Sequence, residues 1–157
     1  MQAQEIIATH PDVRGNTNDA LIRCIEECYS CAQVCTSCAD ASLAEDDVQD
    51  LRQSIRLSLD CADICNITGT IATRRTGSDE GIIRKVLDIC AAACLSCGEE
   101  YRRHASHHEH CRICAEACRR YMEIGSSNAP TQDVSGAPGS AGEQGEAGRQ
   151  GGRCPEF

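Results

Sequence analysis

Thirteen of the fourteen cysteines in this chain fall into four groups in which neighbouring cysteines are three or four residues apart. This spacing places successive side chains on one face of an α-helix, where Leu or Ile normally forms the core stripe. The longest group has five cysteines and would extend over roughly 21 Å of helix. The pattern therefore predicts several helices with thiols facing the core. The four groups are Cys24, Cys28, Cys31, Cys35 and Cys38; Cys61 and Cys65; Cys90, Cys94 and Cys97; and Cys111, Cys114 and Cys118.

The segments that carry these groups are separated by short polar turns, and glycines follow the second and fourth of them. Short connections between helices favour antiparallel neighbours. We therefore predict an all-α fold, an antiparallel up-down four-helix bundle preceded by a short N-terminal helical segment, within residues 1–125. The expected helices are 4–9, 18–44, 48–73, 79–105 and 107–124. Thr17, the pair Asp46 and Asp47, and Ser78 are the expected N-caps.

Residues 126–157 have a different composition, with glycine at every third position from Gly136 to Gly151. Such a repeat is similar to collagen, but the triplets are few and almost lack proline. We interpret this segment as a Gly-rich disordered tail. Cys154 lies in it and is interpreted as a free thiol outside the helical pattern.

Charge and hydropathy exclude several classes of partner. The net charge is −9 and the pI is about 4.9, which argues against nucleic acid and against a polybasic membrane anchor. No stretch reaches the roughly 20 apolar residues of a membrane span. Since the N-terminus resembles no export signal, we expect a cytoplasmic protein in which thiols stay reduced.

Folding the four helices together brings the cysteine groups into layers. We expect Cys90 near Cys28, and Cys94 and Cys97 near Cys31 and Cys35, while Cys111 and Cys114 approach Cys38. The thiols then form one continuous column. The helix at 48–73 interrupts it, because its first half carries Leu51, Ser54 and Ser58 in place of cysteine.

Soft thiolates select Cu(I), Zn(II) or iron–sulfur clusters. Pairs at i, i+3 and i, i+4 suit nearly linear Cu(I), and about one Cu(I) per thiolate leaves the column almost neutral. Zn(II) would leave each isolated four-thiolate site with excess charge, and an iron–sulfur cluster needs a wrapping loop. We therefore predict storage of multiple Cu(I) ions per chain. The alternatives are a zinc- or iron–sulfur-binding module, a copper chaperone of low stoichiometry, and a scaffold stapled by disulfides.

Four of the five histidines gather where the last two helices meet: His104, His107, His108 and His110. Imidazole binds copper without a permanent charge, so these residues are candidate ligands where copper enters the bundle. Met122 is interpreted as a core residue, and Glu45 as part of a solvated helix face. No cysteine stands apart with a base beside it, so the chain is not expected to be an enzyme.

The run Cys24 to Cys38 and the segment His104-Ala105-Ser106-His107-His108-Glu109-His110-Cys111-Arg112-Ile113-Cys114-Ala115-Glu116-Ala117-Cys118 resemble the bacterial copper storage proteins. The resemblance covers about residues 18–124 and is greatest to the cytosolic branch. It implies a homotetramer of helical bundles that holds many Cu(I) ions, with copper entering at the histidine-bearing end and copper chaperones as possible partners. Two departures, Tyr121 in the last stripe and only two cysteines in the second long helix, imply a lower capacity.

Overall fold

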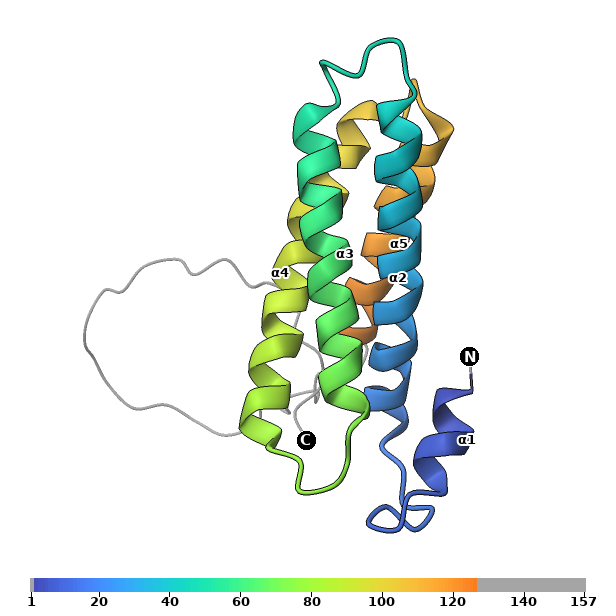
Figure 1. Ribbon diagram of the computed structural model, residues 1–157, viewed down its shortest axis with the longest axis vertical. Helices are drawn as coiled ribbons and strands as arrows, with labels where there is room; N and C mark the ends of the chain where they lie inside the picture. Colours follow the sequence, from blue (N-terminus) through green and yellow to red (C-terminus); the bar gives the residue numbers. More distant parts are fainter. Residues whose placement is uncertain (1, 127–157) are drawn as a thin grey trace, which may run out of the picture.

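A computed structural model describes residues 2–126 as four long helices and one short helix (Figure 1). The elements are α1 (Ala3–Ala8), α2 (Asp19–Leu43), α3 (Arg52–Thr73), α4 (Glu80–His104) and α5 (Glu109–Ser126). The long helices alternate in direction, each packs against the next, and α5 returns to pack against α2. The predicted antiparallel up-down bundle is confirmed. The predicted tail and Cys154 lie outside the described residues.

Two of the long helices begin at side-chain caps. Asn18 and Asp79 each accept a hydrogen bond at 3.0 Å from the backbone N–H three residues further on. The predicted caps, Thr17 and Ser78, were each one residue too early. Their hydroxyls instead donate to the acidic side chain two residues ahead, at 3.2 Å in both cases.

The α2–α3 connection is longer than predicted, because α3 begins at Arg52 and not at Val48. Residues 45–51 form successive tight turns, in which the N–H of Val48 donates to the carbonyl of Glu45 and that of Leu51 to the carbonyl of Val48. Leu51 is fully buried and fixes this connection to the core. The predicted capping role of Asp46 and Asp47 was wrong, since Leu51 occupies the N-cap position without a side-chain cap.

The α4–α5 connection consists of a tight turn that continues directly from the end of α4. The N–H groups of His107 and His108 both donate to the carbonyl of His104 at 3.0 Å, which prolongs the end of α4. Consequently α5 begins at Glu109, two residues later than predicted. Because α2, α3, α4 and α5 alternate in direction, the α2–α3 and α4–α5 connections lie at the same end of the bundle (Figure 1).

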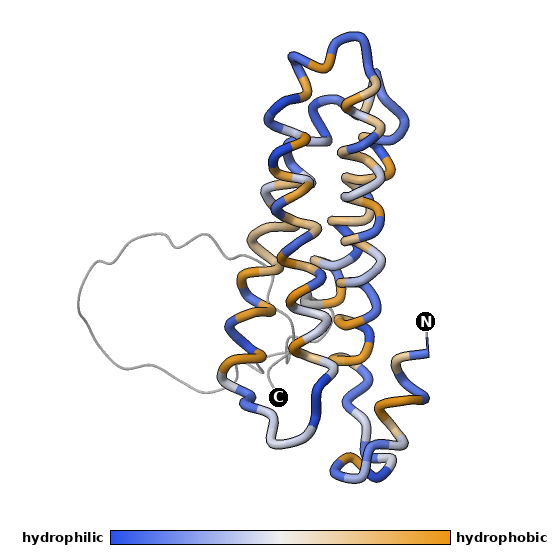
Figure 2. The backbone as a smooth tube through the Cα atoms, in the orientation of Figure 1, coloured by the Kyte–Doolittle hydropathy of each residue, from blue (hydrophilic) through white to orange (hydrophobic). Residues whose placement is uncertain are grey.

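Apolar and polar residues are interspersed along each long helix (Figure 2). The buried residues recur every three or four positions, so every long helix has an inner face. In the middle of the bundle this face consists of thiols, whereas hydrocarbon side chains fill the end beside α1. We call the latter the apolar end; its buried residues include Ile7, Leu21, Ile22, Ile25, Ile83 and Leu87. No helix among residues 2–126 combines the length and the apolar character needed to cross a bilayer.

Candidate metal centre

The thiol column occupies the centre of the bundle. The thirteen cysteines within residues 2–126 all lie outside disulfide bonds, and none is more than 3% exposed. Every long helix contributes to the column, and α2 contributes most. Side chains as small as Cys and Ala allow the helices to approach closely, and at Gly98 an added Cβ would lie 3.1 Å from the Cβ of Cys118.

Cys31 and Cys35 of α2 lie at the centre of the sulfur network. The Sγ of Cys31 lies 3.8 Å from the Sγ atoms of both Cys94 and Cys118, which belong to different helices. The Sγ of Cys35 lies 4.0 Å from that of Cys97. These distances are those of weak S–H···S hydrogen bonds, and they confirm the predicted layers, as does the 3.8 Å contact between Cys28 and Cys90.

The sulfurs converge in overlapping groups, each with its ligand atoms within 4.8 Å of one another. Cys31, Cys35, Cys61 and Cys118 each take part in two of the groups, so sulfur can be shared between neighbouring ions. This overlap distinguishes the column from separate four-thiolate zinc sites, which are closed. The three four-sulfur groups are Cys31, Cys61, Cys65 and Cys94; Cys31, Cys35, Cys61 and Cys118; and Cys35, Cys97, Cys114 and Cys118.

Hydrogen bonds between thiols make the sulfurs chemically unequal. Hydrogen bonds from Cys114 and Cys118 hold the pKa of Cys35 well below its usual range. The hydrogen bonds that Cys118 makes with Cys114 and other thiols, together with its burial, raise its own pKa. At the end of the column, burial raises the pKa of Cys111 to about 12. The thiols around Cys35 therefore favour its ionised form.

In the first half of α3, buried hydroxyl groups take the place of thiols beside the column. Ser54 and Ser58 are fully buried there, and Tyr101 of α4 is also fully buried. The Ser58 hydroxyl donates to the carbonyl of Cys35 at 2.8 Å and lies 3.9 Å from the Sγ of Cys114. The predicted interruption of the thiol stripe in the first half of α3 is confirmed, and serine hydroxyls fill the positions that cysteines would occupy.

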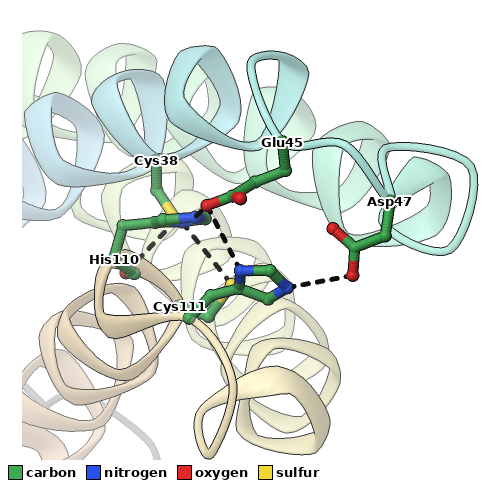
Figure 3. A network of polar contacts seen from close by, with 6 residues as sticks. Cys38, Glu45, Asp47, His110 and Cys111 are labelled. Carbon is green, nitrogen blue, oxygen red and sulfur yellow. Dashed lines mark hydrogen bonds and ion pairs between the residues drawn. The ribbon is translucent and has the colours of Figure 1, made fainter.

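One thiol group at the histidine-bearing end includes an imidazole (Figure 3). The Nδ1 of His110 lies 3.3 Å from the Sγ of Cys38 and 3.5 Å from the Sγ of Cys111. We call these three residues the inner triad. The same side chain is partly exposed, so it connects the buried thiols to the solvent-facing end of the bundle.

Carboxylates from the α2–α3 connection meet His108 of the α4–α5 connection and His110 in the first turn of α5 (Figure 3). The Oε1 of Glu45 lies 3.0 Å from the Nε2 of His110 and 3.2 Å from the Nδ1 of His108. The other ring nitrogen of His108 lies 3.2 Å from the Oδ2 of Asp47. We call the end of the bundle formed by these four residues the mouth. The interpretation of Glu45 as a merely solvated residue was wrong, because it contacts two imidazoles.

The structure brings together only two of the four histidines that the sequence singled out. His104 is half-buried, with its Nε2 3.7 Å from the Oε1 of Glu100. His107 is exposed, and neither residue belongs to a group of converging ligands within residues 2–126. Met122 packs against the core beside Cys94 and Cys118, in agreement with its interpretation as a core residue.

Sequence reasoning missed Glu45 and Asp47 as neighbours of the histidines, although a signal was present. In an up-down bundle the first and third connections between long helices lie at the same end. The acidic run Glu45-Asp46-Asp47 therefore had to face the histidine-rich turn.

Fold and site define a metal-binding four-helix bundle with a thiol core. A family model described as Csp, copper storage protein, matches residues 17–128. The chain belongs to this family, as its sequence predicted. Because copper storage is not catalysis, the family also agrees with the prediction that the chain is not an enzyme.

Solved structures give the same result. The copper storage protein Ccsp of Streptomyces lividans, loaded with 10 copper equivalents, is 49% identical with a TM-score of 0.74, over 78% of this chain and 93% of that one. A structure of a cytosolic copper storage protein from the same organism, with five coppers, is 53% identical with a TM-score of 0.66. The match covers 68% of this chain and 88% of that one.

A sequence relative is also found. The uncharacterized cysteine-rich protein YhjQ of Bacillus subtilis is 36% identical over 94 residues, which are 60% of this chain and 82% of that protein.

Proposed function

We propose that this protein stores and buffers Cu(I), with its thirteen buried cysteines as thiolate ligands, and that the mouth is where copper enters. The overlap of the sulfur groups is the observation that carries this proposal. Sulfurs that belong to two groups can each contact more than one cuprous ion. We expect a capacity on the order of one Cu(I) per thiolate.

Charge explains why a monovalent ion suits this core. A buried ionised thiolate without a partner is strongly unfavourable. One Cu(I) for each thiolate cancels the charge of the column without any other counterion. Each thiol must lose its proton to bind, so loading releases protons into the solvent.

The inner triad supports the proposed route. Cys38 and Cys111 are buried, whereas His110 reaches from their sulfurs to the partly exposed carboxylate of Glu45. A cuprous ion transferred from solvent can therefore bind the imidazole first and the thiols next. His104 and His107 are proposed to help only in attracting copper to this end, since neither converges on the inner triad.

Anaerobic titration of the reduced protein with Cu(I) tests the function. We expect continued uptake to on the order of one ion per bundle cysteine, with protons released in proportion. Saturation after one or two equivalents would contradict storage and support a copper chaperone of low stoichiometry. Tight uptake of Zn(II) in preference to Cu(I) would support a zinc-binding module.

We also propose a cytoplasmic homotetramer that receives copper from copper chaperones. The cytoplasmic location is supported by the Streptomyces relative described as cytosolic. Association is supported by large apolar side chains on the outer faces of α3 and α4, among them Ile67 at 57% and Ile89 at 56% exposed. Sedimentation equilibrium tests the assembly, and a concentration-independent monomer would contradict it.

A further inference from the structure

The mouth carries a second set of metal ligands that differs chemically from the thiols. Glu45, His108 and His110, which we call the outer triad, offer one carboxylate oxygen and two imidazole nitrogens within 4.8 Å of one another. Imidazole and carboxylate suit borderline divalent ions such as Zn²⁺, whereas Cu(I) prefers thiolate. We propose that the outer triad binds one divalent cation of the Zn²⁺ class, separately from the copper held by the thiols.

The spacing of the three atoms fits a shared metal ion. Ligands of a tetrahedral zinc ion, each about 2.0–2.1 Å from the metal, lie about 3.3 Å from one another. The Glu45 oxygen is 3.0 Å and 3.2 Å from the two ring nitrogens. A carboxylate oxygen and an imidazole lone pair this close must share either a proton or a cation. Two of the three ligand pairs therefore already have the spacing that a shared ion requires.

Asp47 supplies the support that metal-binding histidines usually have. It lies 3.2 Å from the Nε2 of His108, on the side of the ring opposite Glu45. A carboxylate in this position accepts the N–H of the distal nitrogen and leaves the other nitrogen free to bind a metal. Glu45 and Asp47 also provide two carboxylates, whose charges match a divalent ion.

His110 links this site to the thiol column. Its Nε2 belongs to the outer triad, and its Nδ1 contacts the Sγ of Cys38 in the inner triad. A divalent ion on Nε2 would hold the ring in place across the route proposed for copper. Occupancy of the outer triad should therefore slow the exchange of Cu(I) with solvent without changing how much the column holds.

The test uses protein whose thiols are already filled with Cu(I), so that added metal cannot compete for sulfur. Anaerobic titration with Co²⁺ should give one saturable site per chain, with weak visible ligand-field bands and without the intense sulfur-to-cobalt charge-transfer bands. Zn²⁺ should displace the Co²⁺. Glu45→Gln and His108→Ala should each weaken Co²⁺ binding at least about tenfold. Glu99→Gln, an exposed carboxylate on α4, and His10→Ala, an imidazole that follows α1, are matched controls that should bind like the parent.

Two results would overturn the proposal. One is the absence of saturable Co²⁺ binding, and the other is equal binding by the parent and Glu45→Gln. Copper content is measured before Co²⁺ is added, and circular dichroism confirms that each variant is folded. A protein that holds its copper but binds no Co²⁺ would refute the divalent site alone, whereas failure to hold copper would refute the proposed function.

Discussion

The two ends of the bundle differ in how they close. At the apolar end, α1 and the first turns of α2 and α4 bring together Ile7, Leu21, Ile22 and Ile83, none more than 7% exposed. At the mouth, two carboxylates and two imidazoles surround the last thiols. The inner faces of the helices therefore end in hydrocarbon side chains at the apolar end and in metal-ligating side chains at the mouth.

This difference assigns separate tasks to the two ends. Hydrocarbon offers nothing that a cuprous ion can bind, so the apolar end contributes stability and seals the column. The mouth offers ligands in series from solvent to thiol, at some cost in apolar burial. The comparison predicts that substitutions at one end change stability, whereas those at the other end change the rate of copper uptake.

The largest effect is expected at the apolar end. Ile25 is 1% exposed, and Ile25→Ala should lower the free energy of unfolding by about 2–5 kcal/mol through lost burial and the cavity left behind. Chemical denaturation of the reduced protein measures this. Ile6→Ala, at a position on α1 that is 67% exposed, is the control and should change stability by less than about 0.5 kcal/mol. A clear change in the initial rate of Cu(I) uptake by Ile25→Ala would contradict the assignment of stability to the apolar end and copper uptake to the mouth.

The next largest effect is expected at the mouth. His110→Ala removes the imidazole between solvent and the sulfurs of Cys38 and Cys111, and should slow Cu(I) uptake roughly tenfold, with little change in final capacity. Stopped-flow mixing with a buffered Cu(I) donor measures the rate. His10→Ala, an imidazole that follows α1, is the control. Equal rates for the parent and His110→Ala would mean that copper reaches the column by another route.

A smaller effect is expected from completing the thiol column. Ser58→Cys would place a sulfur close to Cys114 and should add roughly one Cu(I) per chain to the capacity. Loss of the hydrogen bond to the Cys35 carbonyl should cost about 1 kcal/mol of stability in the metal-free protein. Anaerobic titration measures the gain, and Ser96→Cys on the outer face of α4 is the control. An unchanged capacity would show that the serine section does not adjoin the copper sites.

The last prediction concerns pH and the metal-free protein alone. Burial raises the pKa of Cys111 from 9.0 to about 12, so the folded metal-free protein keeps this proton while the unfolded chain loses it. The contribution to stability is present below the unfolded pKa and is lost as pH rises from about 9 toward 12. Urea unfolding of the metal-free protein across this range should show the decline, and Cys111→Ser should show less of it. A decline of the same size in both proteins would assign it to other groups.

The helical bundle and the thiol layers could be predicted because they follow from local spacing. Cysteines three and four residues apart define a helix face, and the short connections fix the order in which the faces meet. Once that order is known, contacts such as Cys28 with Cys90 follow directly.

The mouth could be predicted only in part, because its geometry depends on how two connections fold. The tight turns at 45–51 direct Glu45 and Asp47 toward the histidines, and no periodic pattern marks such turns. The dependence on turn geometry also explains why the sequence did not show which histidines would converge. Adjacent residues in a tight turn point in different directions, so His108 joins the outer triad whereas His107 faces solvent.

The central position of α2 has a consequence for the lifetime of the molecule in a cell. Sulfurs of this one helix contact sulfurs of both α4 and α5, as Cys31 does with Cys94 and Cys118. Each cuprous ion bound between such sulfurs fastens separate helices together, so every ion makes local opening rarer. Proteases cut opened chains, and they should therefore degrade poorly loaded copies before well-loaded ones. Turnover would then spare the molecules that carry cargo, with no receptor needed to distinguish them.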